Sequence, residues 1–448
     1  MPRPLRALAH RLRAQARTRL GDVPAPPSPT IPRLRVVTRE IAAVDDVLAY
    51  SAATDPLFWS RRGDALAGFG VALRLEAAPG APTPAAELAV RWRSVAAAAD
   101  IDDAVGVPGT GLVALGSFAF DPSSAHASVL TVPATLVGRR GGRTWVTHVR
   151  VDEPVPDADA AALPPATPFG PHWSATLGPG RMSAQGYQDA VRTALEAIAR
   201  HDVEKVVLAR DVVGTVPSGA DLRRLVRALL SGYPDCWVFA VDGLIGASPE
   251  TLVTASRGTV TARVLAGTIA RGADADADTA ASLFLSDSGK DQDEHRFAVR
   301  SVLDALRPHT SALAAAEEPF TLRLPNVWHL ATDVEGELDD GSSSLDLVAA
   351  LHPTAAVAGT PTPTAMAMIR RLEPFDRGRY AGAVGWIDAS GDGEWAIALR
   401  CAQFDLPDAN GALPITAYAG AGIVAGSDPE TELLETRVKF RPIVEALA

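Results

Sequence analysis

Lysine is rare in this chain, and each lysine is a candidate for chemistry that arginine cannot perform. Of the 42 basic residues, only Lys205, Lys290 and Lys439 are lysines. A guanidinium group stays protonated and cannot act as a proton-transfer base, whereas burial and neighbouring charges can lower the pKa of an amine. The chain therefore keeps lysine where an amine is needed, unless these positions survived by chance.

Lys205 lies in the segment VEKVVLAR, whose β-branched residues predict a strand. Strand alternation places its side chain on the same face as those of Val203 and Val207. An amine between two valines is partly desolvated, which lowers its pKa and makes it usable as a general base. The alternative is an edge-strand lysine that protects against aggregation.

Glu250 follows a Gly-Ala-Ser-Pro bend between two apolar strands. A carboxyl group held at such a bend can be partly buried, and burial raises its pKa toward the range that a general acid requires. A solvated turn glutamate is the competing interpretation.

Two segments predict helices that carry paired carboxylates. In GKDQDEHRFAVRSVLDAL, a helix begins near Lys290 and places Asp291 and Glu294 on one face, at positions i and i+3.

The second of these helices begins at Asp428-Pro429, a capping residue followed by a first-turn proline. On it, Glu432, Glu435 and Lys439 share a face. Two helices that present only carboxylate oxygens suit a hard cation, magnesium above all, and the His/Cys ligands typical of zinc are missing. The alternative is a pair of solvated helix faces.

The run AGAGIVAG precedes the second helix. Its glycine spacing and its place near the C-terminus argue against a dinucleotide site. We expect its glycines to let backbone N–H groups approach an anion at the helix N-terminus. Arg400 follows an apolar strand and is a candidate for clamping a carboxylate.

Composition restricts the class of protein. The 448 residues are 47% hydrophobic and 21% charged, which is typical of a globular protein. The two cysteines exclude a disulfide scaffold and a cysteine-based metal centre, and a net charge of −11 argues against a nucleic-acid binder. Because no apolar run is long enough to span a membrane, we expect a soluble, cytoplasmic enzyme.

Three regions follow one another along the chain. Residues 1–33 form an Arg- and Pro-rich basic leader, which we expect to be a flexible, solvated extension. Residues 34–178 are strand-rich, with a hairpin turn at Gly141-Gly142 and a connecting loop over 152–178. Residues 179–448 are the region of the candidate catalytic residues. Within them, ADADADTA (273–280) is predicted to be a flexible loop.

Several motifs in the chain resemble those of the chorismate-utilising enzymes, most closely the isochorismate synthases. In order, they are KVVLAR, GASPE, LAGTIAR, SGKDQDEH, HLATDVEG, LHPTAAVAGTPT, RGRYAGAVGW, GEWAIALR and AGAGIVAGSDPETELLET. The resemblance implies an α/β (α+β) fold: one large domain with two mostly antiparallel β-sheets layered with helices. It also implies that 179–448 is the chorismate-binding core.

The resemblance implies a role for each candidate residue. Lys205 matches the general base that activates water, and Glu250 matches the general acid at the departing hydroxyl. Glu294 and Glu435 match ligands of Mg²⁺, with Asp291 and Glu432 in support. The positions that match substrate contacts are Gly267, Thr268, Ala356, Arg400, Gly420 and Lys439, and Tyr380 and His329 are expected to line the same pocket.

The implied reaction is the magnesium-dependent, reversible conversion of chorismate to isochorismate, in which water adds at C2 as the C4 hydroxyl leaves. The alternatives are a salicylate synthase, which goes on to eliminate pyruvate, and an aminating synthase that makes anthranilate or aminodeoxychorismate with a glutaminase. Ala356 favours the first reaction, because a threonine is typical of the other branches at this position. We expect a monomer or homodimer without a glutaminase subunit, serving menaquinone or siderophore biosynthesis.

Overall fold

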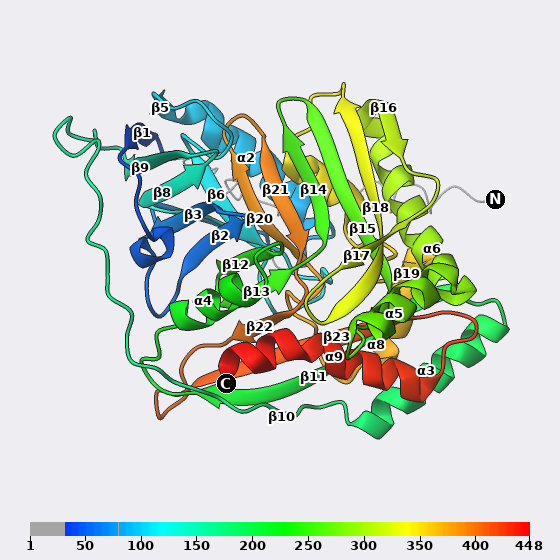
Figure 1. Ribbon diagram of the computed structural model, residues 1–448. Helices are drawn as coiled ribbons and strands as arrows, with labels where there is room; N and C mark the ends of the chain where they lie inside the picture. Colours follow the sequence, from blue (N-terminus) through cyan, green and yellow to red (C-terminus); the bar gives the residue numbers. More distant parts are fainter. Residues whose placement is uncertain (1–31, 79) are drawn as a thin grey trace, which may run out of the picture. The chain divides into compact units, whose positions relative to one another are not determined.

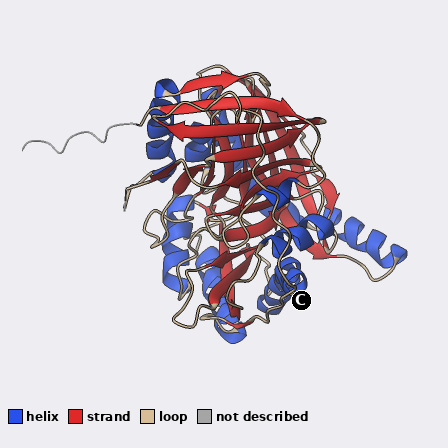
Figure 2. Ribbon diagram, turned by 90° about the vertical axis from the view of Figure 1, so that its left-hand side faces the viewer, coloured by secondary structure: helices blue, strands red, loops and turns tan. Residues whose placement is uncertain are grey.

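The computed structural model describes residues 32–78 and 80–448, so nearly all of the basic leader predicted for residues 1–33 lies outside the described part (Figure 1). Two large β-sheets dominate the described residues, and helices cover their outer faces (Figures 1 and 2). All strand pairs are antiparallel except that between β1 and β5. The predicted fold of two mostly antiparallel sheets layered with helices is therefore confirmed.

The first sheet has 13 strands among the described residues. Its order is β10 (Gly178–Pro179), β11 (Lys205–Val216), β23 (Leu413–Ile423), β22 (Cys401–Phe404), β13 (Leu244–Ser248), β12 (Trp237–Val241), β2 (Leu57–Arg61), β3 (Asp64–Phe69), β8 (Thr135–Arg140), β9 (Arg143–Val151), β1 (Leu34–Ile41) and β5 (Asp100–Asp103), with β19 (Gly359–Thr360) paired to β11.

The second sheet has 10 strands in the same part of the chain. Its order is β16 (Thr310–Ala315), β18 (Val327–Leu338), β15 (Thr259–Ala270), β14 (Thr251–Ser256), β21 (Gly393–Ile397), β20 (Ala383–Asp388), β6 (Val113–Ser117), β7 (Val129–Val132) and β4 (Leu73–Glu76), with β17 (Phe320–Arg323) paired to β18. Strands from either side of residue 178 thus lie side by side in both sheets, for example β2 with β12 and β6 with β20.

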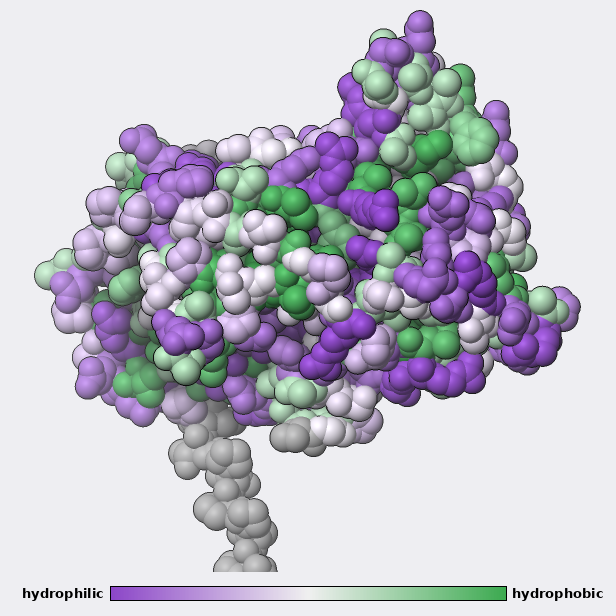
Figure 3. Space-filling view, turned by 90° about the horizontal axis from the view of Figure 1, so that it is seen from below, coloured by the Kyte–Doolittle hydropathy of each residue, from purple (hydrophilic) through white to green (hydrophobic). Residues whose placement is uncertain are grey.

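Helices α4 and α9 pack on the first sheet, and α2, α6 and α7 pack on the second. On the face drawn in Figure 3, polar side chains surround small apolar areas. Within the described residues, no helix combines the length and apolarity needed to cross a membrane. The helices are α2 (Pro84–Ala98), α3 (Ala184–Ala199), α4 (Arg223–Gly232), α5 (Ala275–Asp287), α6 (Gly289–Leu306), α7 (Ser344–Leu351), α8 (Thr362–Leu372) and α9 (Pro429–Leu447), with short 3₁₀ helices at η1 (Val47–Tyr50) and η2 (Arg307–His309).

Local sequence signals explain several of these boundaries. Asp428 caps α9 by accepting a hydrogen bond from the backbone N–H of Thr431, and Pro429 occupies the first turn, as predicted. Gly141 and Gly142 join β8 to β9 with φ angles of +56° and +83°, which glycine adopts without strain. The predicted connection is also confirmed, since residues 152–177 contain neither helix nor strand.

The prediction of a flexible loop over residues 273–280 is wrong, because most of this segment begins helix α5. Asp274 is the N-cap and accepts a hydrogen bond from the backbone N–H of Ala277 at 2.8 Å. Asp276 and Asp278 lie in the first turn, where negative charge stabilises the exposed N–H groups of a helix. The repeated aspartates are therefore a helix start rather than low-complexity filler.

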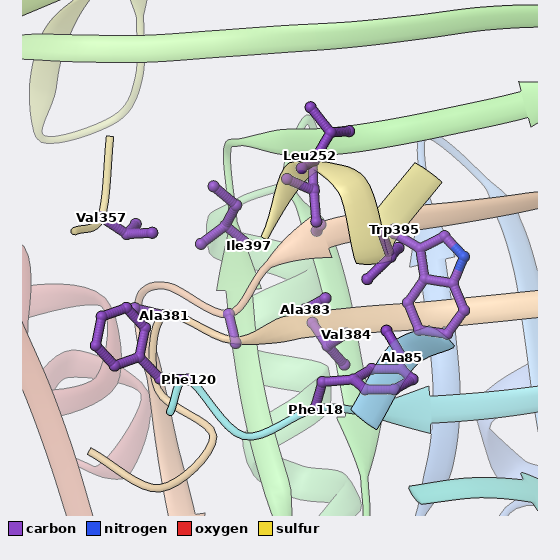
Figure 4. Packing of buried hydrophobic residues seen from close by; sticks show 14 of the residues in the cluster. Ala85, Phe118, Phe120, Leu252, Val357, Ala381, Ala383, Val384, Trp395 and Ile397 are labelled. Carbon is purple, nitrogen blue, oxygen red and sulfur yellow. The ribbon is translucent and has the colours of Figure 1, made fainter. Parts of the chain in front are cut away.

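Aromatic and aliphatic side chains of both sheets and of the helices that cover them form one large core cluster. Phe118 and Trp395 meet edge to face with ring centroids 5.5 Å apart, beside Val384 on β20 (Figure 4). Ala381 and Val357, labelled in the same view, belong to this core and also line the cavity described next. The core and the cavity therefore share residues, so the packing of the core determines the position of this part of the cavity wall.

Candidate active site

One cavity brings together most of the residues singled out from the sequence. Its walls come from β11, β15, β18, β23, α6, α9 and the loops between them. The predicted residues that line it are Glu250, Gly267, Thr268, Glu294, His329, Ala356, Tyr380, Arg400, Gly420 and Lys439. Four predicted residues are outside this lining: Lys205, Asp291, Glu432 and Glu435.

Glu250 lies in the predicted bend between β13 and β14 and is only 4% exposed. Burial raises the pKa of its carboxyl group to about 8, although a hydrogen bond from the backbone of Leu265 and the charge of Lys205 oppose the shift. The group is therefore mostly protonated at neutral pH and can donate a proton into the cavity.

Lys205 opens β11 and is completely buried. Its Nζ lies 3.3 Å from Oε1 of Glu294 and has no hydrogen-bond partner among the described residues. Through Glu294, which lines the cavity, Lys205 lies just behind the cavity wall. An amine whose donors are uncommitted can still interact with a bound molecule or water.

Gly422 creates the space for this pair, and the sequence analysis did not single it out. A Cβ atom at this position would lie 2.0 Å from Oε1 of Glu294 and 3.0 Å from Cε of Lys205. Any larger residue would displace the buried pair. In the sequence, the only indication that Gly422 is important is its place in the glycine run AGAGIVAG.

The function predicted for that run is wrong for Gly420 and Gly422, because both lie in a strand, and only Gly426 lies between this strand and helix α9. Gly420 and Gly422 belong to β23 and pair with Ala209 and Val207 of β11. Helix α9 starts only at Pro429. The glycines serve close packing on the cavity side of the sheet, and the carbonyl of Gly420 accepts a hydrogen bond from Nζ of Lys439 at 2.9 Å.

Each lysine of the chain pairs with a glutamate from α6 or α9. Besides the pair of Lys205 with Glu294, Nζ of Lys290 lies 2.6 Å from Oε1 of Glu432. Nζ of Lys439 lies 2.6 Å from Oε1 of Glu435, one turn earlier on the same helix. The three amines thus partly neutralise the acidic face of the two helices.

The carboxylates of the two helices influence one another. Burial, and then the charge of Glu435, raises the pKa of Glu432 to about 7. Burial also raises the pKa of Asp291, with contributions from Glu294 and Glu435. A set of oxygen donors whose charges repel one another fits a hard divalent cation such as Mg²⁺. In the arrangement of the described residues, however, no three His, Cys, Asp or Glu side chains converge as a metal-binding group.

Arg400, His329 and Thr268 form a hydrogen-bonded chain along the cavity. Nη2 of Arg400 donates to Nε2 of His329 at 3.1 Å, and Nδ1 of His329 lies 3.0 Å from Oγ1 of Thr268 and 3.2 Å from the carbonyl of Gly267. Because arginine can only donate, Nε2 is the acceptor and Nδ1 carries the proton. Burial and Arg400 hold the pKa of His329 well below its usual value, so the ring is neutral.

Arg400 has a backbone φ of +50°, which is uncommon for a residue other than glycine. Burial lowers its pKa, yet an arginine remains charged. A buried guanidinium group beside a neutral histidine can bind an anionic group that enters the cavity.

Arg377 and Tyr418 also line the cavity, and the sequence analysis did not single them out. The rings of Tyr418 and Tyr380 are stacked with centroids 5.3 Å apart. Arg377 is paired with Glu373 inside the protein. The motif RGRYAGAVGW contained the signal for Arg377, but nothing local distinguishes it from the chain's many other arginines.

Comparisons with known proteins show to which family this chain is similar. A family model described as "Chorismate binding enzyme" matches residues 28–448. The chain is 39% identical over 275 residues to the isochorismate synthase DhbC of Bacillus subtilis (strain 168), a match that covers 59% of this chain and 68% of the relative. It is 31% identical over 474 aligned positions to the salicylate biosynthesis isochorismate synthase of Pseudomonas aeruginosa, covering 99% of this chain and 96% of the relative.

Among solved structures, the fold is similar to MenF, the menaquinone-specific isochorismate synthase from Escherichia coli. The TM-score is 0.73 at 26% sequence identity, and the match covers 98% of this chain and 100% of that one.

Proposed function

The chain belongs to the chorismate-binding enzymes, whose family model spans residues 28–448, and we propose that it interconverts chorismate and isochorismate. The family expected from the sequence motifs is thereby confirmed. The observation that carries the proposal is the buried carboxyl group of Glu250, which shares one cavity with Arg400 and Glu294.

The reaction needs a base and an acid. Water adds at C2 of the ring while the hydroxyl at C4 departs and the double bonds shift. Lys205 takes the proton from the attacking water, and Glu250 gives its proton to the departing hydroxyl. These roles are supported by the burial of Glu250, which raises its pKa to about 8, and by the Nζ of Lys205, which is enclosed without a hydrogen-bond partner among the described residues.

Chorismate carries two carboxylates that must be held without repelling the site's own acids. Arg400 supplies a guanidinium group, and Lys439 supplies an amine anchored on the carbonyl of Gly420. Magnesium, when bound, would neutralise carboxylate charge and orient the substrate. Glu294 and Glu435 would hold it, supported by Asp291 and Glu432, since the charges of Glu294 and Glu435 reach Asp291 and that of Glu435 reaches Glu432.

Ala356 supports isochorismate as the final product. It lines the cavity with a methyl group, where a hydroxyl would be needed to align the ring for pyruvate elimination. Amination would instead require a site that excludes water, together with a supply of ammonia. The relatives reported above bear the names of isochorismate synthases, so we infer that no glutaminase subunit is required.

Product analysis after incubation with chorismate and Mg²⁺ tests this function. We expect an equilibrating mixture of chorismate and isochorismate, salicylate no higher than in the enzyme-free control, and no dependence on ammonium. Equal amounts of salicylate and pyruvate, formed as fast as chorismate is lost, would instead assign the protein to the salicylate synthases.

A further inference from the structure

Arg377 lies in the cavity wall, but its side chain is committed to the protein. It is 4% exposed and pairs with Glu373 through two hydrogen bonds, Nε to Oε2 at 2.8 Å and Nη2 to Oε1 at 2.6 Å. The guanidinium carbon also lies 4.4 Å from the ring centroid of Phe120 and 6.0 Å from that of Tyr380. The hydrogen bonds to Glu373 and the two aromatic rings therefore hold the guanidinium group in place.

The same pair is hydrogen-bonded to two neighbouring segments of the cavity wall, β11 and the loop of Ala356 and Val357, which also meet directly where the N–H of Val207 donates to the carbonyl of Ala358. Nη1 of Arg377 donates to the carbonyl of Val357 at 3.0 Å, and Nη2 donates to the carbonyl of Val207 at 2.8 Å. Oε1 of Glu373 accepts the backbone N–H of Ala209 at 2.8 Å. Strand β11 and the loop that carries Ala356 are therefore tied to one buried ion pair.

We propose that Arg377 is a positioning residue that sets the spacing between the Ala356–Val357 segment and β11. This spacing determines how the substrate ring meets the attacking water, so the inference rests on the proposed function. Val207, Ala356 and Val357 all line the cavity, and β11 also carries Lys205. A displacement of about 1 Å at reacting atoms can lower a rate on the order of a hundredfold.

Lysine cannot replace Arg377 in this role. Its ammonium is a single point charge and cannot bind both oxygens of Glu373 in a planar fork while reaching two separate carbonyls. The proposed substrate anchors, Arg400 and Lys439, come from other elements and stay in place in such a variant. We therefore expect a loss in kcat rather than in substrate binding.

Arg223 provides a matched control. It is also fully buried, binds Asp221 through Nε and Nη2 at 2.9 and 2.7 Å, and donates to the carbonyls of Thr167 and Pro168. It lies on α4 and does not line the cavity. Replacing Arg223 therefore measures the effect of losing a buried, paired arginine on stability, without a direct effect on the cavity.

The experiment compares Arg377→Lys with Arg223→Lys in Tm, kcat, KM and backbone amide exchange. We expect both variants to lower Tm. Only Arg377→Lys should lower kcat, by about 10- to 100-fold, with KM within about threefold of the wild type. Only this variant should speed amide exchange in residues 354–360 and at Val207, whose N–H donates to the carbonyl of Ala358.

Glu373→Gln is the second variant, used if Arg377→Lys does not fold, and we expect from it the same pattern with a smaller loss in kcat. Equal kcat in the Arg377 and Arg223 variants, or unchanged exchange in residues 354–360, would overturn the positioning role. A wild-type protein that leaves chorismate unchanged would count against the proposed function, and the exchange comparison would still test Arg377 by itself.

Discussion

Nζ of Lys290 lies 2.6 Å from Oε1 of Glu432, and this contact joins helix α6 to helix α9 across 142 positions of sequence. Glu432 is 1% exposed, whereas the side chain of Lys290 is 26% exposed, so the pair joins a buried carboxyl group to a partly exposed amine. The two helices that carry the proposed magnesium ligands are therefore held together by one lysine, next to the ligands themselves.

Lys290→Met should destabilise the protein by about 3 kcal/mol, because it leaves a buried carboxyl group without its partner. The free energy of unfolding by urea measures this. Arg441→Met is the control, since the Arg441–Glu445 pair lies on α9 with both side chains exposed, and its loss should cost less than about 1 kcal/mol. Equal effects of the two substitutions would show that the Lys290 pair is not structurally important.

Glu294→Gln and Glu435→Gln should each abolish magnesium-dependent turnover and weaken Mg²⁺ binding by at least about tenfold in calorimetry. The reason is that each change removes one anionic oxygen ligand of the proposed site. Glu430→Gln, at an exposed position in the first turn of α9, is the control and should bind Mg²⁺ as the wild type does. Unchanged Mg²⁺ affinity in both site variants would place the cation elsewhere.

Lys205→Arg should lower kcat by about 10²- to 10⁴-fold, the range typical of losing a general base. Arginine stays protonated beside Glu294, whereas a base must reach its neutral form before it can accept a proton. Circular dichroism and Tm establish that the variant is folded, and Lys205→Ala provides a second variant without added bulk. Turnover near that of the wild type in Lys205→Arg would exclude Lys205 as the base.

The activity should decline as pH rises through about 8, because the pKa of Glu250 is raised to about 8 and only its protonated form can donate. The pH profile of kcat/KM measures this decline on the alkaline side.

Stability should respond in the same direction. The folded state binds this proton more tightly than the unfolded chain, whose pKa is near 4.5. The stabilising contribution is therefore complete below about 4.5 and is lost as pH rises toward 8. Glu250→Gln should remove this part of the pH dependence of unfolding and should also be inactive. An unchanged slope would mean that Glu250 is not the titrating group.

Ala356→Thr should shift the product mixture toward salicylate and pyruvate, since a hydroxyl in the cavity wall could align the ring for elimination. Chromatography after extended incubation at neutral pH measures the ratio. Ala356→Ser adds the hydroxyl without the extra methyl group and separates polarity from bulk. A product ratio that is identical in all three proteins would show that this position does not select the reaction.

Local sequence signals determined much of the secondary structure, and together with the family motifs they identified about half of the residues that line the cavity. The cap at Asp428 and the Gly141-Gly142 hairpin depend on contacts within a few residues, so the local sequence predicts them directly. The exception is α5, where the low-complexity composition predicts a loop, but the aspartate side chains cap and stabilise the start of a helix. The amphipathic spacing of Asp291 with Glu294, and of Glu432 with Glu435, likewise follows from helix geometry alone.

Tertiary structure alone decided which groups meet. The pairing of Lys290 with Glu432, and the bonds from Arg377 to Val207 and Val357, join positions that no local pattern relates. The same holds for the raised pKa of Glu250, because burial by distant strands causes it. Periodicity specifies the face of an element on which a residue lies, whereas the neighbour on the opposing element depends on how two sheets and their helices pack. That packing is a property of the whole fold.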